Sequence, residues 1–166
     1  MKLSFSTKGW HNKSFDEFCN IARELKFGGI ELHNINGELF KNKDGAFHGY
    51  AAAATVRRLY EMKLELPCID VISYICEEGA IAETESCIKI AEDLHAPNIR
   101  IKSAECDSDT AKKFITAVLP QAEKAGVTLV IETSGAFSNT AVLRELLDSF
   151  ASDNLAALWD MYSTFF

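Results

Sequence analysis

The chain has 166 residues, of which 48% are hydrophobic and 25% are charged, a balance typical of one globular domain with a substantial apolar core. Its net charge of −7, with no run of Lys or Arg, argues against the basic surface that nucleic-acid binding requires. No apolar run approaches the roughly 18–20 residues of a membrane span, and the first residues lack the apolar core of a signal peptide. Five cysteines without a CxxC pair indicate reduced, mostly buried thiols in a cytoplasmic protein.

Short apolar runs alternate with longer helical patterns along the whole sequence. The runs that predict strands are Lys2–Ser6, Gly29–His33, Leu66–Ser73, Asn98–Lys102, Val127–Glu132 and Ala156–Asp160. The patterns that predict helices are Ser14–Lys26, Ala46–Met62, Ala80–His95, Ser108–Ala125 and Thr140–Phe150. Because no linker or low-complexity stretch separates these elements, we expect a single domain over residues 1–166.

Several predicted helices begin at residues suited to cap them. Ser14, followed three residues later by Glu17, forms the capping-box pattern, in which each side chain accepts a hydrogen bond from the backbone N–H of the other residue. Asp109 and Asn139 are also expected to be N-caps, because their side-chain oxygens can accept from free N–H groups of a first helical turn.

The alternation of strands and helices predicts a parallel α/β fold, because a parallel strand pair needs a long crossover connection. An open doubly wound sheet and a closed eight-stranded barrel both satisfy this pattern. The segment after the first strand, Ser6–Trp10, lacks the glycine fingerprint of a dinucleotide-binding sheet, and the chain contains no phosphate-binding loop of the Walker type. The polar pattern of the strands then favours the barrel.

Alternate side chains of the predicted strands separate into an apolar face and a polar face, since strand residues point alternately to opposite sides. The polar face collects Glu31, His33, Asp70, Arg100, Lys102, Glu132 and Asp160. Most of them lie near the C-terminal ends of their strands, which form the active-site rim of a barrel. Unpaired buried charge is costly, so these residues either brace the interior as ion pairs (Arg100 or Lys102 with Glu31 or Asp70) or form a polar site. The size of the set favours a polar site.

Several segments of the sequence resemble the strands of one known family. Gly29–His33 (GIELH), Val130–Thr133 (VIET) and Leu158–Asp160 (LWD) resemble strands two, five and six of the sugar phosphate isomerase/epimerase family, which belongs to the xylose isomerase-like TIM barrels. The resemblance covers the whole chain in order and spacing. It implies a (β/α)8 barrel of which about six β/α units are present, with the chain ending after strand six.

The resemblance also implies a chemistry. Members of the family generally hold one divalent cation (Mn²⁺, Mg²⁺, Co²⁺ or Zn²⁺), which polarises a sugar or polyol substrate and stabilises an enediolate. Glu132 matches the first metal ligand and one of the two proton-transferring carboxylates, and Asp160 matches the second metal ligand. The polar face of the strands makes Glu31, His33, Asp70, Arg100 and Lys102 the expected contacts to substrate, with His11 in the first loop on the same rim. A hydrogen-bonded interior pair is the alternative for Glu31 and His33.

Two features depart from the family pattern. The third and fourth metal ligands and the second catalytic Glu belong to strands seven and eight, beyond Phe166, and Ser163 stands where members commonly have a substrate-contacting His. We therefore expect weak metal binding and little activity from this chain alone. We also expect a homo-oligomer in which a second copy covers the open barrel edge.

Two other functions compete with the isomerase. A barrel relative of the endonuclease IV type would need a His-rich trinuclear zinc site and a basic surface, whereas this sequence has four histidines and a negative net charge. A non-catalytic barrel fragment or binding module would keep the fold without the chemistry. Metal content and substrate-dependent proton exchange distinguish that module from an isomerase.

Overall fold

The computed structural model describes residues 2–10, 13–35 and 47–165. Six parallel strands form one sheet, in the order in which they occur in the chain. They are β1 (Ser4–Ser6), β2 (Gly29–His33), β3 (Ile69–Tyr74), β4 (Asn98–Lys102), β5 (Thr128–Glu132) and β6 (Leu155–Leu158). A doubly wound sheet reverses its strand order part-way along, whereas a (β/α) barrel adds each new strand beside the last. The uninterrupted order therefore confirms the predicted barrel-type architecture.

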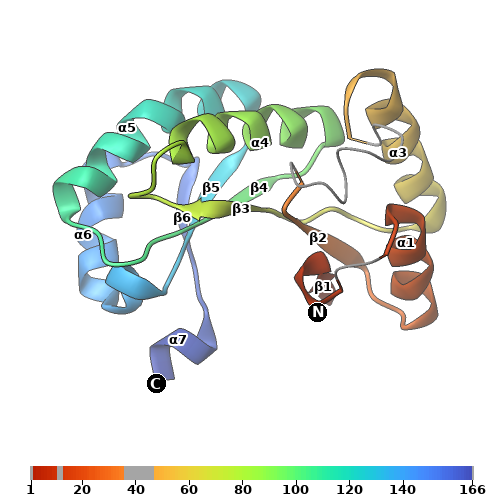
Figure 1. The fold of residues 1–166 in the computed structure, drawn as a ribbon, viewed down its shortest axis with the longest axis horizontal. Coiled ribbons are helices and arrows are strands. Elements are labelled where there is room, and N and C mark those ends of the chain that lie inside the picture. The colour runs from red at the N-terminus through yellow and green to blue at the C-terminus, as the bar shows by residue number, and fades with distance from the viewer. Residues whose placement is uncertain (1, 11–12, 36–46, 166) are drawn as a thin grey trace.

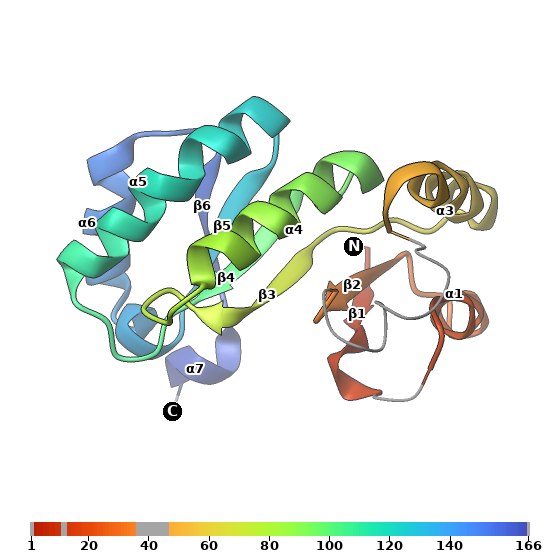
Figure 2. The ribbon, with the colours of Figure 1, turned by 45° about the horizontal axis from the view of Figure 1, so that its top comes forward.

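Helices connect successive strands and cover the outer face of the curved sheet. They are α1 (Phe15–Glu24), α3 (Gly49–Met62), α4 (Ala80–Leu94), α5 (Ser108–Ala125) and α6 (Thr140–Phe150), and the short α7 (Met161–Phe165) follows β6. Helices α3 to α6 follow one another around one side of the sheet, while α7 lies apart from α4 and α5 (Figures 1 and 2). Among the described helices, none combines the length and apolar character needed to cross a membrane.

The core lies between the outer face of the sheet and this helix layer. The strand residues that point into it are at most 1% exposed: Ile30, Leu32, Ile69, Val71, Ile99, Ile101, Leu129 and Ile131. Phe18 of α1, Ile88 of α4 and Ile115 of α5 are fully buried in the same cluster. Burying one such side chain stabilises a fold by about 1.5–3 kcal/mol, so this layer holds the strands in place. The predicted apolar face is confirmed.

The helix caps follow the predictions with one correction. The capping box of α1 is complete, with Ser14 N donating to Glu17 Oε2 over 2.7 Å and Glu17 N donating to Ser14 Oγ over 3.3 Å. Asn139 caps α6. The prediction for Asp109 is wrong: Asp107 has the extended backbone of an N-cap, and Asp109 lies within the first turn of α5.

Some strand ends differ from the predicted ones. β3 begins at Ile69 and not at Leu66, and Pro67, which has no N–H to donate to the ladder, lies just before it. β6 ends at Leu158, so Asp160 lies beyond the strand instead of at its end. The predicted helix start at Ala46 falls outside the described residues.

A close backbone approach joins two loops at the C-terminal end of the sheet. Gly135, just after β5, has φ +56°, and a Cβ atom added there would lie 1.9 Å from the carbonyl oxygen of Ser103, just after β4. No real Cβ atom fits at that distance, so the loops can approach each other only because residue 135 is glycine.

We expect Gly135→Ala to lower the free energy of unfolding by about 3 kcal/mol or more, because the backbone must move and the left-handed conformation becomes strained. Gly9→Ala is the matched control, since its Cβ would meet no atom within 4 Å. Urea denaturation of both variants measures the difference. Equal stabilities for the two variants would contradict the close approach.

Candidate functional site

Six polar side chains from four neighbouring strands meet on the inner face of the sheet, and we call them the charged cluster. Its members are Glu31, His33, Asp70, Arg100, Lys102 and Glu132. Strand register explains the assembly, because His33 pairs with Asp70 across β2 and β3, and Asp70 pairs with Arg100 across β3 and β4. Paired residues of a parallel ladder point to the same face, so these three side chains stand side by side.

Asp70 is the centre of the charged cluster, and its side chain is completely buried. Arg100 donates to it twice, from Nε to Oδ1 and from Nη2 to Oδ2, each over 3.0 Å. Lys102 Nζ lies 3.2 Å from Oδ1, and His33 Nδ1 lies 2.5 Å from Oδ2. A planar guanidinium can donate two parallel hydrogen bonds to one carboxylate. This arrangement fixes the relative orientation of the two side chains and also pairs their opposite charges.

Arg100 also links Asp70 to two other carboxylates. Its Nη1 donates to Glu31 Oε2 over 3.4 Å, and its Nε lies 3.4 Å from Glu132 Oε2. A single guanidinium on β4 therefore joins acidic residues from β2, β3 and β5. The ion-pair network considered from the sequence is present, and it pairs Arg100 with Asp70 and Glu31 together.

Ionisation at the centre of the cluster is set by these contacts. Burial works against the ionised form of Asp70, but hydrogen bonds from Arg100 and the charges of Arg100 and Lys102 outweigh it and hold the pKa of Asp70 below its usual value. Burial likewise opposes the charge of Arg100, but the bonded Asp70 and the nearby Glu31 and Glu132 raise its pKa. Both groups are therefore charged at neutral pH.

The cluster holds more carboxylates than Arg and Lys side chains. Three carboxylates, Glu31, Asp70 and Glu132, face two permanent cations, Arg100 and Lys102. Among the described residues, the buried Oε1 atom of Glu31 has no hydrogen-bond partner, and leaving such an atom unsatisfied costs roughly 1–3 kcal/mol. Glu31 also lines a hollow of about 300 Å³ on the inner face. A ligand group that donates a hydrogen bond would satisfy this oxygen.

Asp160 lies outside the network of hydrogen bonds and ion pairs that the structure describes for the cluster. Its Oδ2 accepts from Ser163 Oγ over 2.5 Å and its Oδ1 accepts from Tyr162 N over 3.1 Å, so it caps the start of α7. The hydrogen bond from Ser163 is the main cause of its lowered pKa, and the charge of Arg100 contributes a smaller part. Ser163, noted in the sequence as a replacement for His, thus serves as a partner of Asp160.

Two residues near the site were not singled out from the sequence. Thr7 Oγ1 accepts from His33 N over 2.9 Å, and Thr133 Oγ1 accepts from Asp160 N over 2.8 Å. Both threonines are buried and directly follow a predicted strand. That position, next to the rim of the barrel, is the signal in the sequence that could have identified them as site residues. His11, expected to contact substrate, lies outside the described residues.

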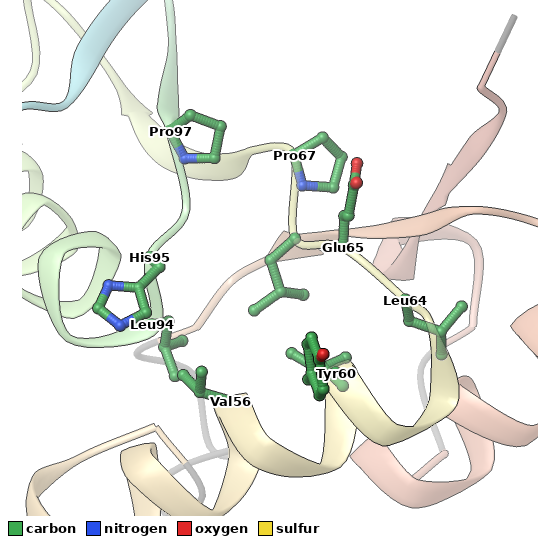
Figure 3. A pocket seen from close by; sticks show the side chains of 10 residues that line it. Val56, Tyr60, Leu64, Glu65, Pro67, Leu94, His95 and Pro97 are labelled. Atoms are coloured by element: carbon green, nitrogen blue, oxygen red, sulfur yellow. The ribbon is translucent and has the colours of Figure 1, made fainter.

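An apolar hollow lies at the opposite end of the strands (Figure 3). It has a volume of about 400 Å³ and lies beside the segments that lead into β3 and β4, with Pro67 and Pro97 in its wall. Tyr60, Glu65 and His95 add polar groups at its edge, but no member of the charged cluster lines it. In barrels this end serves stability, so the charged cluster is the better candidate site.

Comparison with protein-family models finds no match, and no curated protein is similar in sequence. Solved structures do match. The IolI protein with a bound zinc atom is 14% identical with a TM-score of 0.78, and a D-tagatose 3-epimerase-like protein is 13% identical with a TM-score of 0.77. The probable 3-DHS dehydratase AsbF from Bacillus anthracis is 19% identical with a TM-score of 0.74.

The six-stranded sheet and its helices match part of the fold of xylose isomerase-like TIM barrels. The three matches cover 96–99% of this chain, and the chain spans 63–66% of their length. Proteins with this barrel fold differ in chemistry, since an AP endonuclease of family 2 from Brucella melitensis also matches, with 15% identity and a TM-score of 0.64. Identities this low establish the fold, and the activity must be argued from the site.

Metal ions occur in some of these barrels, namely zinc in IolI and magnesium in a xylose isomerase-like barrel from Mycobacterium smegmatis. The carboxylates of Glu132 and Asp160 fit a hard cation in ligand type. They fall short in number, because no group of three or more His, Cys, Asp or Glu residues in the described part of the chain is arranged to hold a metal. The described residues alone do not form a complete metal site.

The lowered pKa of Asp70 gives stability a specific pH dependence. A carboxyl group whose pKa is lower in the folded chain stabilises the fold at pH values above its unfolded pKa of about 3.9, and this contribution is lost as pH falls through the lower folded value. We expect the carboxyl ¹³C resonance of Asp70 to titrate with a midpoint below about 3.9. We also expect urea denaturation to show a loss of stability that begins near pH 4.

A midpoint for Asp70 at or above about 3.9 would contradict the proposed role of Arg100.

Proposed function

We propose that the charged cluster binds a sugar or a related polyol, and that the chain belongs to a metal-dependent isomerase or epimerase. The observation that carries this proposal is the gathering of Glu31, Asp70 and Arg100 on the inner face of a xylose isomerase-like barrel, in contact with Glu132 at the C-terminal end of β5. In essentially every characterised enzyme with this architecture, that end holds the active site. The family resemblance in β2, β5 and β6 supports the same substrate class.

The residue types suit a ligand with several hydroxyl groups. Carboxylate oxygens accept hydrogen bonds from hydroxyls, and the unsatisfied Oε1 of Glu31 is available for one of them. The side chains of Glu31 and Glu132 are 13% and 14% exposed, so each can reach a ligand on the inner face.

Glu132 is the proposed acid–base residue. Its carboxylate accepts a proton from a carbon next to a carbonyl group and returns a proton to the product. Arg100 touches Glu132 and holds it in place, and Lys102 adds a second positive charge at the same end of β4. Positive charge near the substrate oxygen favours the enediolate that forms when the proton leaves.

Glu132 and Asp160 would supply two oxygen ligands to a divalent cation, with further ligands from outside the described residues. Such a cation acts as a Lewis acid on a substrate carbonyl. Because two carboxylates are few for Mn²⁺ or Mg²⁺, we propose that this chain alone binds the cation weakly and turns over little substrate.

A non-catalytic binding module is the second candidate. The observation in its favour is that both proposed metal ligands already have internal partners, Arg100 for Glu132 and Ser163 for Asp160. A nuclease of the endonuclease IV type is not proposed, because the net charge is −7 and the described residues offer no His-rich metal site.

Titration calorimetry with Mn²⁺ tests the metal part of the proposal. We expect a dissociation constant weaker than about 10 μM, and a further loss of at least tenfold in Glu132→Gln and in Asp160→Asn, because each change removes one of two carboxylate ligands. Asp148→Asn, an exposed carboxylate on α6, is the matched control and should bind as the wild type does.

The same samples, titrated with ketoses and polyols and observed by ¹⁵N NMR, test the substrate class. Shifts confined to the C-terminal ends of β2 to β5, and weakened at least tenfold by Glu31→Gln, would support a polyol site. Sugar binding without Mn²⁺ binding would favour the binding module. Binding of neither Mn²⁺ nor any sugar would overturn the proposed function.

A further inference from the structure

Two cysteines lie in neighbouring loops at the same end of the strands as the charged cluster. Cys76 is exposed in the loop between β3 and α4, and Cys106 is half-buried in the loop between β4 and α5. Cys76 Sγ lies 3.7 Å from the carbonyl oxygen of Glu105, the residue before Cys106. Cys106 Sγ in turn donates to the carbonyl oxygen of Asp107 over 3.5 Å.

The backbone around the two thiols is already held together. Ile75 N donates to the carbonyl oxygen of Lys102 over 3.0 Å, which fixes the loop after β3 against the end of β4. Neighbouring strands are about 4.8 Å apart, and a disulfide joins Cα atoms roughly 4.4–6.8 Å apart. Cys76 lies two residues beyond β3 and Cys106 four residues beyond β4, and the contact between Cys76 Sγ and the carbonyl oxygen of Glu105 brings the two loops together at this point.

We propose that Cys76 and Cys106 form a reversible disulfide that ties these two loops together beside the charged cluster. The oxidant is a low-molecular-weight disulfide of the glutathione class. The Cys76 thiolate attacks one sulfur of that disulfide, forming a mixed disulfide and releasing one thiol. The Cys106 thiolate then attacks Cys76 Sγ and releases the second thiol. Overall, two protein thiols and one small disulfide give one protein disulfide and two small thiols.

The five cysteines differ in their suitability for this chemistry. Burial raises the pKa of Cys19 to about 11 and the pKa of Cys68 and Cys87 to about 12, so these three stay protonated and inert. Burial and the nearby charges of Cys76 and Asp107 raise the pKa of Cys106 as well. Cys106 is therefore a poor first nucleophile, and the exposed Cys76 is the thiol that a small disulfide meets first.

The disulfide is a modification site that is independent of the proposed function. It would lock the loop after β3 to the loop that follows Arg100 and Lys102 on β4. In a reducing compartment such a bond forms only transiently, which is the behaviour of a redox-responsive pair.

The test oxidises the purified chain with graded mixtures of oxidised and reduced glutathione and counts thiols by maleimide labelling under denaturing conditions. We expect five labels in the reduced chain and three in the oxidised chain, with peptide mapping joining Cys76 to Cys106. Reduced glutathione should restore five labels. The thermal midpoint of the oxidised chain should rise by about 5–10 °C, because the bond closes a long loop in the unfolded state.

Variants decide which thiols are used. After oxidation, peptide mapping should find no bond between two cysteines of the chain in Cys76→Ser or Cys106→Ser, whereas Cys68→Ser, the control, should still lose two labels and join Cys76 to Cys106. Labelling under denaturing conditions makes the count independent of how stably each variant folds. A mixed disulfide that persists on Cys76 with Cys106 free, or a bond to any other cysteine, would overturn the proposal.

Discussion

The inner face of the sheet depends on the two-point contact between Arg100 and Asp70. A carboxylate with a completely buried side chain would be costly if unpaired, and the guanidinium on the neighbouring strand supplies two hydrogen bonds and a full positive charge. The same guanidinium then reaches Glu31 and Glu132, so four strands bring their polar side chains to one point. Without that contact, the acidic residues would repel one another at the place where the proposed substrate binds.

The apolar face of the same strands determines where this polar cluster lies. Each strand that contributes a charged residue inward also buries apolar residues outward, such as Ile99 and Ile101 on either side of Arg100. Alternation therefore makes the core and the candidate site two sides of one sheet. Partial exposure matters for function, since Arg100 and His33 keep 16% and 20% of their side chains accessible while Asp70 beneath them keeps none. The buried carboxylate thus orients the groups that a ligand can reach.

Sequence alone predicted the alternation of strands and helices, the parallel sheet and the face on which Asp70 and Arg100 lie, because these features follow from local periodicity. It left open whether Arg100 pairs with Glu31 or Asp70, since partners depend on the register between strands that are about 30 residues apart in the chain. The prediction that Asp160 ends a strand was wrong. Asp160 lies beyond β6 and caps α7, where its carboxylate accepts hydrogen bonds from Tyr162 N and Ser163 Oγ, and strand periodicity does not indicate these contacts. The contact between Cys76 and the backbone of Glu105 could not be foreseen either, because it depends on how two loops lie against each other.

A double-mutant cycle measures the coupling between Asp70 and Arg100, on which the charged cluster depends. Asp70→Asn, Arg100→Met and the double variant are compared with the wild type by urea denaturation at pH 7. A buried pair in good geometry predicts that each single change costs about 3–5 kcal/mol, and that the double variant loses much less than the sum, with a coupling energy of at least roughly 2 kcal/mol. Additive effects, with a coupling below about 0.5 kcal/mol, would show that the two residues act independently and would contradict the account.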